Sequence, residues 1–174
     1  MEIQLPYGSH SVQVNVPDDY VLTYPRDLPG VDDVYSEIRR AMSEPIGCAP
    51  LRDIASGRLD AAVVINDITR PAPSQVMLEL ILEELRIAGI NEDAVTVVIA
   101  TGNHRPNTPH EIEQMIGPNL AHRLRVINHV CDDEKGLTYV GTIETGLPVW
   151  VNSSVAKSSL KVLTGIITPH HGAG

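Results

Sequence analysis

Two stretches of the chain share one pattern: residues 61–71 are AAVVINDITRP and residues 94–106 are AVTVVIATGNHRP. In each, a continuous apolar run leads into a short polar loop that ends in proline. A helix is predicted after each loop, because apolar residues recur at helical spacing from Ser74 to Ala88 and from Thr108 to Ile116. Apolar runs that alternate with helices are typical of parallel strands covered on both faces. The sequence therefore predicts an α/β fold with a mostly parallel sheet and helices on both of its faces.

Capping signals mark the start of the second helix and the ends of both. Thr108 and Glu111 have the spacing of a capping box, and Pro109 stands at the first helical position. Gly117 follows the last periodic residue of this helix, and Gly89 follows the preceding helix in the same way.

Further elements are predicted on both sides of this central region. Residues Glu2 to Val16 predict a β-hairpin, since apolar and polar residues alternate around the turn at Tyr7, Gly8 and Ser9. The remaining predicted elements are an extended loop over 17–30, a helix over Val31–Met42, a helical turn over Leu51–Ser56, strands over Arg125–His129, Thr138–Thr142, Pro148–Val151 and Leu160–Ile167, and a short helix over Ser153–Ser158.

The composition argues against several classes of partner. The 174 residues are 43% hydrophobic and carry a formal net charge of −9, whereas nucleic-acid binding depends on Lys and Arg to neutralise phosphates. No apolar run approaches the ~18 residues of a membrane span, and no signal-peptide pattern is present at Met1. Cys48 and Cys131 have no metal-ligand spacing and indicate reduced thiols. We therefore expect a cytoplasmic protein that binds neither nucleic acid nor a membrane.

Three polar loops follow predicted strands. They are Asn66–Pro71, Thr101–Pro106 and Thr168–Gly174. In open α/β sheets, ligands bind in the crevice outside the carboxyl ends of the strands. We therefore expect these loops to converge on one site.

The side chains in these loops suit a small organic acid. Arg70 has a planar guanidinium that matches a carboxylate. His104 and His170 are suited to proton transfer near neutral pH. Asp67 is placed either to orient an imidazole or to hold Arg70. The coincidence of these residue types at three strand ends favours a functional site over ordinary turns.

A metal-dependent hydrolase is a further hypothesis for the same residues. Asp67, His104 and either His170 or His171 have ligand atoms that suit zinc. Their signal is weak, because they come from three separate loops without the spacing of a known zinc motif.

The sequence resembles the N-terminal domain of the nickel-dependent lactate racemase family. The resemblance runs along nearly the whole chain as short blocks in the same order: Leu5–Gly8, Pro45–Gly47, Pro50–Leu51, Asp67–Pro71, Ile99–Pro106 with Glu111, Asn128–His129, Gly141–Thr142, Gly146, Val151–Asn152, Gly165, Pro169–His170 and Ala173–Gly174.

The resemblance implies a racemase or epimerase of 2-hydroxy acids. It implies a nickel-pincer nucleotide derived from nicotinic acid, to which hydride passes from the α-carbon while a histidine removes the hydroxyl proton. By motif, His104 and His170 are similar to the two catalytic histidines that serve the two enantiomers. Arg70 is similar to the carboxylate clamp, and Asp67 to its supporting partner.

The chain departs from the family pattern at Gly174. In the family, a lysine that holds the cofactor, a nickel-binding histidine and a second α/β domain all come later. We therefore expect residues 1–174 to be an incomplete N-terminal catalytic and cofactor domain without metal ligands of its own. We expect it to be inactive in isolation, with the missing C-terminal domain as its partner. The alternative is a natural short form that serves as a noncatalytic organic-anion-binding or assembly module.

Overall fold

The computed structural model describes residues 1–23 and 28–168 and divides the chain into two compact units, residues 1–32 and 33–174. The first unit is an antiparallel hairpin of β1 (Glu2–Tyr7) and β2 (His10–Asn15). Gly8 lies at the turn with a φ of 60°, a conformation that glycine adopts without steric cost. The predicted N-terminal hairpin is confirmed.

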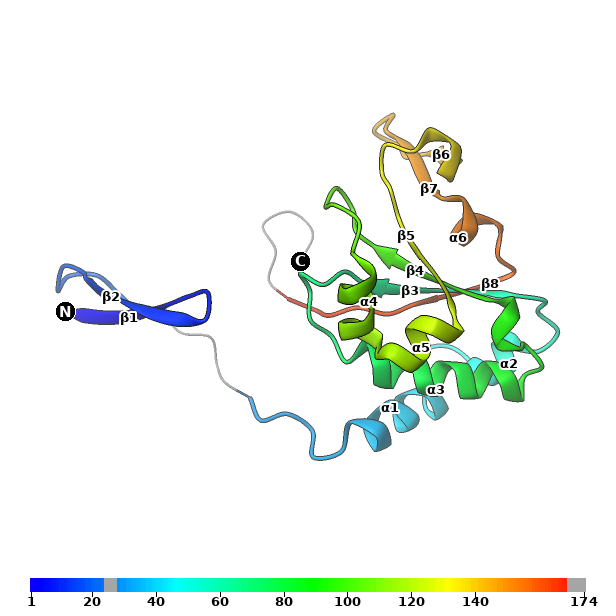
Figure 1. The fold of residues 1–174 in the computed structure, drawn as a ribbon, viewed down its shortest axis with the longest axis horizontal. Coiled ribbons are helices and arrows are strands. Elements are labelled where there is room, and N and C mark those ends of the chain that lie inside the picture. Colours follow the sequence, from blue (N-terminus) through cyan, green and yellow to red (C-terminus); the bar gives the residue numbers. More distant parts are fainter. Residues whose placement is uncertain (24–27, 169–174) are drawn as a thin grey trace. The chain divides into compact units, whose positions relative to one another are not determined.

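The second unit is built on a four-stranded parallel sheet with the order β5-β4-β3-β8 (Figure 1). Its strands are β3 (Ala61–Asn66), β4 (Val95–Ala100), β5 (Arg125–Asn128) and β8 (Leu160–Leu163). Because β3 and β4 pair from Ala61 with Val95 to Asn66 with Ala100, they end level with one another. The polar loops after both strands therefore begin side by side.

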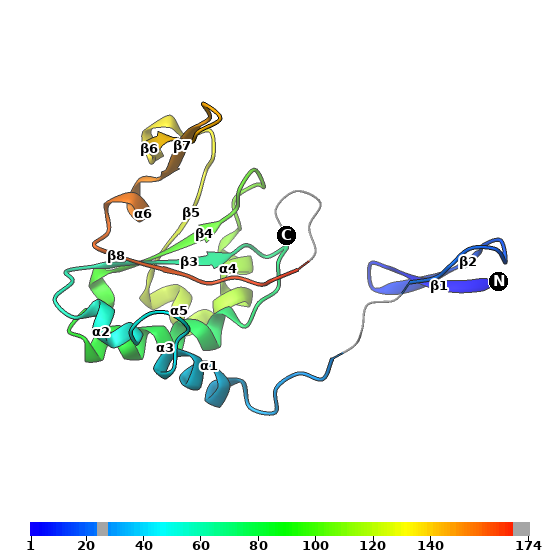
Figure 2. The same cartoon turned by 180° about the vertical axis from the view of Figure 1, so that it is seen from behind.

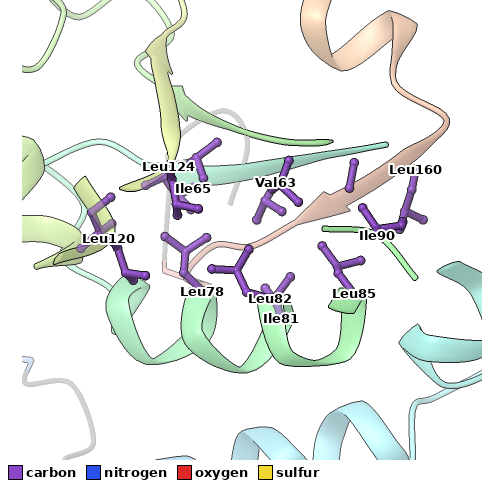
Figure 3. Packing of buried hydrophobic residues seen from close by; sticks show 14 of the residues in the cluster. Val63, Ile65, Leu78, Ile81, Leu82, Leu85, Ile90, Leu120, Leu124 and Leu160 are labelled. Carbon is purple, nitrogen blue, oxygen red and sulfur yellow. The ribbon is translucent and has the colours of Figure 1, made fainter. Parts of the chain in front are cut away.

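The hydrophobic core lies between this sheet and α3 (Ser74–Ile87), as Figure 3 shows. Val63 and Ile65 of β3 face Leu78, Leu82 and Leu85 of the helix, and all five side chains are buried. This packing follows from the sequence, because alternate strand residues share one face of the sheet and residues three to four positions apart share one face of a helix.

Three more helices of the second unit contribute to this core. They are α2 (Leu51–Ala55), α4 (Pro109–Ile116) and α5 (Pro118–Arg123). The predicted capping box of α4 is present, and Gly117 ends that helix. Helix α5 is a short helix that the sequence pattern missed. Its start is hidden because Gly117 ends one helix and Pro118 begins the next at once.

Helices α1 (Val34–Ser43) and α2 are joined to α3 through acidic residues of α3. Arg52 of α2 forms a bidentate ion pair with Glu84, with N···O distances of 2.7 and 2.8 Å. From α1, the Tyr35 hydroxyl donates to Glu79 and Arg39 pairs with Glu83. Helix α1 begins at Val34, later than predicted, because Asp33 accepts a hydrogen bond from the Ser36 amide and caps the helix.

The opposite face of the sheet is covered by α6 (Ser153–Lys157), which contacts β3 and β4 (Figure 2). Helices on both faces are thus confirmed. Between β5 and α6, β6 (Leu137–Thr142) and β7 (Pro148–Asn152) form a separate antiparallel hairpin. Two 3-10 turns, Glu92–Ala94 and Glu134–Gly136, precede β4 and β6.

No helix in the described part of the chain is long and apolar enough to cross a membrane.

Leu85 and Ile87 offer a test of the α3 interface, since both are apolar and lie on the same helix. Leu85 is fully buried, whereas Ile87 is 53% exposed. We expect Leu85→Ala to lower the free energy of unfolding by about 2–5 kcal/mol, because the core is left with a cavity. Ile87→Ala should change it by no more than about 0.5 kcal/mol. Urea denaturation followed by circular dichroism measures both, and equal losses would contradict the packing described above.

Candidate active site

The loop after β3 folds around the carboxylate of Asp67, which is 4% exposed. Its Oδ1 atom accepts hydrogen bonds from the Thr69 backbone amide (3.0 Å) and the Thr69 hydroxyl (2.6 Å). The Arg70 amide donates to the Asp67 carbonyl at 3.0 Å and closes the turn. One oxygen of Asp67 is therefore fixed by its own loop, and Oδ2 is left for another partner.

That partner is His104, from the loop after β4. Its Nδ1 atom lies 2.6 Å from Asp67 Oδ2. An ionised carboxylate only accepts hydrogen bonds, so Nδ1 carries the proton and donates it to Asp67. The tautomer with Nδ1–H has a basic Nε2, and this atom makes no hydrogen bond with the residues that the structure describes. His104 is thus arranged as a proton acceptor whose ring is held from behind by a buried carboxylate.

The charge of Asp67 is maintained by its hydrogen bonds. Burial raises the pKa of this carboxyl, but the hydrogen bonds from Thr69 and His104 together outweigh burial and lower the pKa below its ordinary value. Asp67 is consequently ionised at neutral pH, as orientation of the His104 ring requires.

Arg70 lies on the same loop as Asp67 and is exposed. Its Nη1 atom donates to the carbonyl of Thr69 at 3.3 Å and lies 3.5 Å from the Thr69 hydroxyl. No acidic residue of the described segments forms an ion pair with it. Its guanidinium is therefore available to an anion.

The structure brings the side chains of Asp67 and His104 into direct contact. The Asp67 carboxylate is linked to the Arg70 guanidinium through the Thr69 hydroxyl, which lies 2.6 Å from Asp67 Oδ1 and 3.5 Å from Arg70 Nη1. Of the two roles expected for Asp67, the geometry favours orientation of an imidazole over support of Arg70. His170 and His171 lie outside the described residues, so their place in the site stays a prediction.

Sequence reasoning missed Thr69, whose hydroxyl lies between the three candidate residues. The Asp-x-Thr spacing at residues 67–69 was a usable signal, because aspartate commonly accepts a hydrogen bond from the backbone two residues later.

The loop that carries His104 is held by α4. Arg105 forms a bidentate ion pair with Glu111 at 2.6 and 2.8 Å, and Glu111 also accepts from the Thr108 amide. These contacts, with Arg105 first, lower the pKa of Glu111 to about 2. The carboxylate that closes the capping box therefore also anchors the residue next to His104.

Comparison with known proteins identifies the family of the chain. Residues 7–174 match the family model described as the lactate racemase N-terminal domain. The chain belongs to this family.

Two curated lactate racemases are similar to the chain. The enzyme from Thermoanaerobacterium thermosaccharolyticum is 31% identical over 176 residues, and that from Lactiplantibacillus plantarum is 26% identical over 181 residues. Each alignment covers 99% of this chain and 41% of the relative. This chain thus spans well under half the length of these enzymes.

Solved structures support the same fold. The lactate racemase apoprotein from T. thermosaccharolyticum superposes with a TM-score of 0.82 at 29% identity, covering 98% of this chain and 40% of that one. A protein from Thermotoga maritima has a TM-score of 0.61 at 20% identity, covering 79% of this chain and 34% of that one, and it shows a shared fold alone.

The resemblance to lactate racemases implies a nickel-containing cofactor. Within residues 1–23 and 28–168, no three His, Cys, Asp or Glu side chains come together to hold a metal ion. Asp67 and His104, which the sequence offered as possible metal ligands, are hydrogen-bonded to one another. These residues by themselves do not fit a nickel site.

The Glu111 contacts predict a defined dependence of stability on pH. A carboxyl whose pKa is lowered on folding stabilises the folded state above its ordinary pKa of 4.5, and this stabilisation is lost as the pH falls toward about 2. Glu111→Gln removes the titrating group. We expect the wild type to have the higher melting temperature above pH 4.5, and the difference from Glu111→Gln to shrink toward pH 2. Differential scanning calorimetry across this pH range measures both melting temperatures. A difference in melting temperature that does not vary with pH would contradict the lowered pKa of Glu111.

Proposed function

We propose that this chain supplies the substrate anchor and the proton-transfer group of a racemase or epimerase that acts on 2-hydroxy acids. The observation that carries the proposal is the contact of His104 with the buried carboxylate of Asp67. It lies on the same sheet edge as the guanidinium of Arg70, which forms no ion pair with the described residues. Membership of the lactate racemase N-terminal domain family supports it. The substrate class is the one that the lactate racemase relatives imply, and these residues suit it, since a 2-hydroxy acid presents a carboxylate beside a hydroxyl group.

Arg70 binds the substrate carboxylate through two parallel N–H···O bonds. This contact places the neighbouring hydroxyl group toward His104. Nε2 of His104 then accepts the hydroxyl proton, and Asp67 stabilises the imidazolium that forms through the Nδ1–H bond. Removal of this proton prepares C2 to release hydride and become the planar carbon of a 2-oxo acid.

Two further parts of the proposal concern the hydride acceptor and the second histidine. We propose that a nickel-pincer nucleotide would supply the hydride acceptor in the intact enzyme. We assign His170 as the counterpart of His104 for the opposite enantiomer. Exposed free thiols at Cys48 and Cys131 support a reducing, cytoplasmic location.

His104→Gln tests the proton-transfer role in the protein that includes the second domain. Glutamine keeps a similar size but cannot take a proton, so we expect kcat for racemisation to fall about 10²- to 10⁴-fold. His110→Gln is the matched control, since His110 is exposed on α4 and lies outside the site. Racemisation is followed by chiral chromatography of lactate and larger 2-hydroxy acids. Full activity of His104→Gln in both directions would refute the proposed role.

A second candidate function is binding of an organic anion without turnover. It is favoured by the guanidinium of Arg70, which forms no ion pair with the described residues. On either hypothesis, we expect the 174-residue chain to bind 2-hydroxy acids. Arg70→Ala should weaken binding about ten- to a hundredfold, because a charge-assisted contact is lost, and Arg70→Lys should restore only part of the affinity.

Isothermal titration calorimetry measures this binding, with Arg58→Ala as a control for general loss of positive charge. Binding that is lost equally in Arg58→Ala would show that Arg70 is no specific anchor. Binding by the chain combined with no racemisation by the two-domain protein would favour the binding module over the enzyme.

A further inference from the structure

The loop between β4 and α4 is held at its far end by a contact between a side-chain amide and the backbone. The side-chain amide of Asn128, the last residue of β5, pairs with the backbone of Asn107. The Asn107 N–H donates to Asn128 Oδ1 at 2.8 Å, and Asn128 Nδ2 donates to the Asn107 carbonyl at 3.1 Å. We call this reciprocal contact the amide clasp. The carbonyl oxygen and one N–H of the Asn128 side-chain amide thus pair with the N–H and the carbonyl oxygen of one backbone residue.

The near end of the same loop is held by the next residue of the chain, His129. The buried Thr101 hydroxyl donates to the His129 carbonyl, and the His129 amide donates to the carbonyl of Ile99 at 3.0 Å. Residues 128 and 129 therefore fix both ends of the segment from Thr101 to Asn107.

His104 lies in the middle of this segment. Its amide donates to the Thr101 carbonyl at 2.9 Å, so its backbone is set by the near end of the loop. Asn107 is 5% exposed, and without the clasp its buried backbone amide and carbonyl lack these partners. A backbone group that is buried in this way needs a partner, so loss of the clasp displaces the loop toward water.

We propose that Asn128 is a positioning residue for His104, which it holds against Asp67 through the amide clasp. Asn128 does not act on the substrate. The inference rests on the proposed function for its effect on catalysis, while its effect on the Asp67–His104 contact is independent of turnover.

Asn128→Asp is the sharpest test, because the two side chains have nearly the same shape. Aspartate keeps the acceptor for the Asn107 amide but places an oxygen opposite the Asn107 carbonyl, where Asn128 Nδ2 donates. Asn119→Asp is the matched control. Asn119 is exposed, and its side chain bonds to the described residues through Oδ1 alone, which accepts from Arg123 at 2.9 Å, so aspartate serves there equally well.

The first readout is the Nδ1–H proton of His104, observed by NMR in the ¹⁵N-histidine-labelled 174-residue chain and assigned with His104→Gln. We expect this hydrogen-bonded signal in the wild type and in Asn119→Asp, and its loss in Asn128→Asp with the circular dichroism spectrum retained. If Asn128→Asp does not fold, Asn128→Ala removes the clasp without adding a charge and is measured in its place. Retention of the signal in a folded Asn128 variant would overturn the proposal. Failure of both variants to fold would overturn it too, since the clasp would then hold the fold and not His104.

The second readout is racemisation by the two-domain protein. Displacement of a proton-transfer group lowers kcat, and we expect a loss of about tenfold to a hundredfold in Asn128→Asp. KM should be unchanged, because Arg70 lies on a different loop. A rise in KM at constant kcat would contradict the positioning role. If the wild type does not racemise any 2-hydroxy acid, the proposed function fails, and the NMR result still decides whether Asn128 positions His104.

Discussion

Parallel pairing of β3 with β4 is the constraint on which the site depends. The two strands are apolar along nearly their whole length, and burial of Val63, Ile65, Val97 and Ile99 against one layer of helices sets their register. A shift by one residue would turn these side chains to the other face. With Asn66 opposite Ala100, the next residues of both strands leave the sheet at the same level. The contact between Asp67 and His104, 37 positions apart in the sequence, follows from this register.

Burial of Asp67 at this edge is tolerated because its oxygens are satisfied. A buried ionised carboxylate without partners is strongly unfavourable. Here Oδ1 accepts from two groups of Thr69 and Oδ2 accepts from His104. The same hydrogen bonds that make the charge acceptable also fix its direction. The imidazole is thus oriented by groups of the protein itself, which is the property expected of a preorganised proton acceptor.

The sequence predicted the sheet, its main helices and the meeting of two strand-end loops, because these follow from local periodicity and one general rule of α/β folds. It did not predict which side chain the Asp67 carboxylate would contact, since Arg70 is nearer in the sequence and His104 is brought near only by folding. Nor did it predict the role of Asn128. Side-chain amides that pair with a distant backbone leave no periodic signal. The β6–β7 hairpin was predicted as strands, but periodicity within a strand carries no information on its partner.

His104 and Arg70 differ in how firmly they are held, and this difference suits their proposed tasks. His104 makes a 2.6 Å bond to a buried charge and belongs to a loop fixed at both ends. Within the described residues, the exposed side chain of Arg70 has only contacts of 3.3 and 3.5 Å, both to Thr69. Side-chain entropy lost on binding therefore falls mainly on Arg70, which opposes affinity. The proton acceptor needs no such ordering, so the geometry of the chemical step is set by the fold and the strength of substrate binding by the arginine.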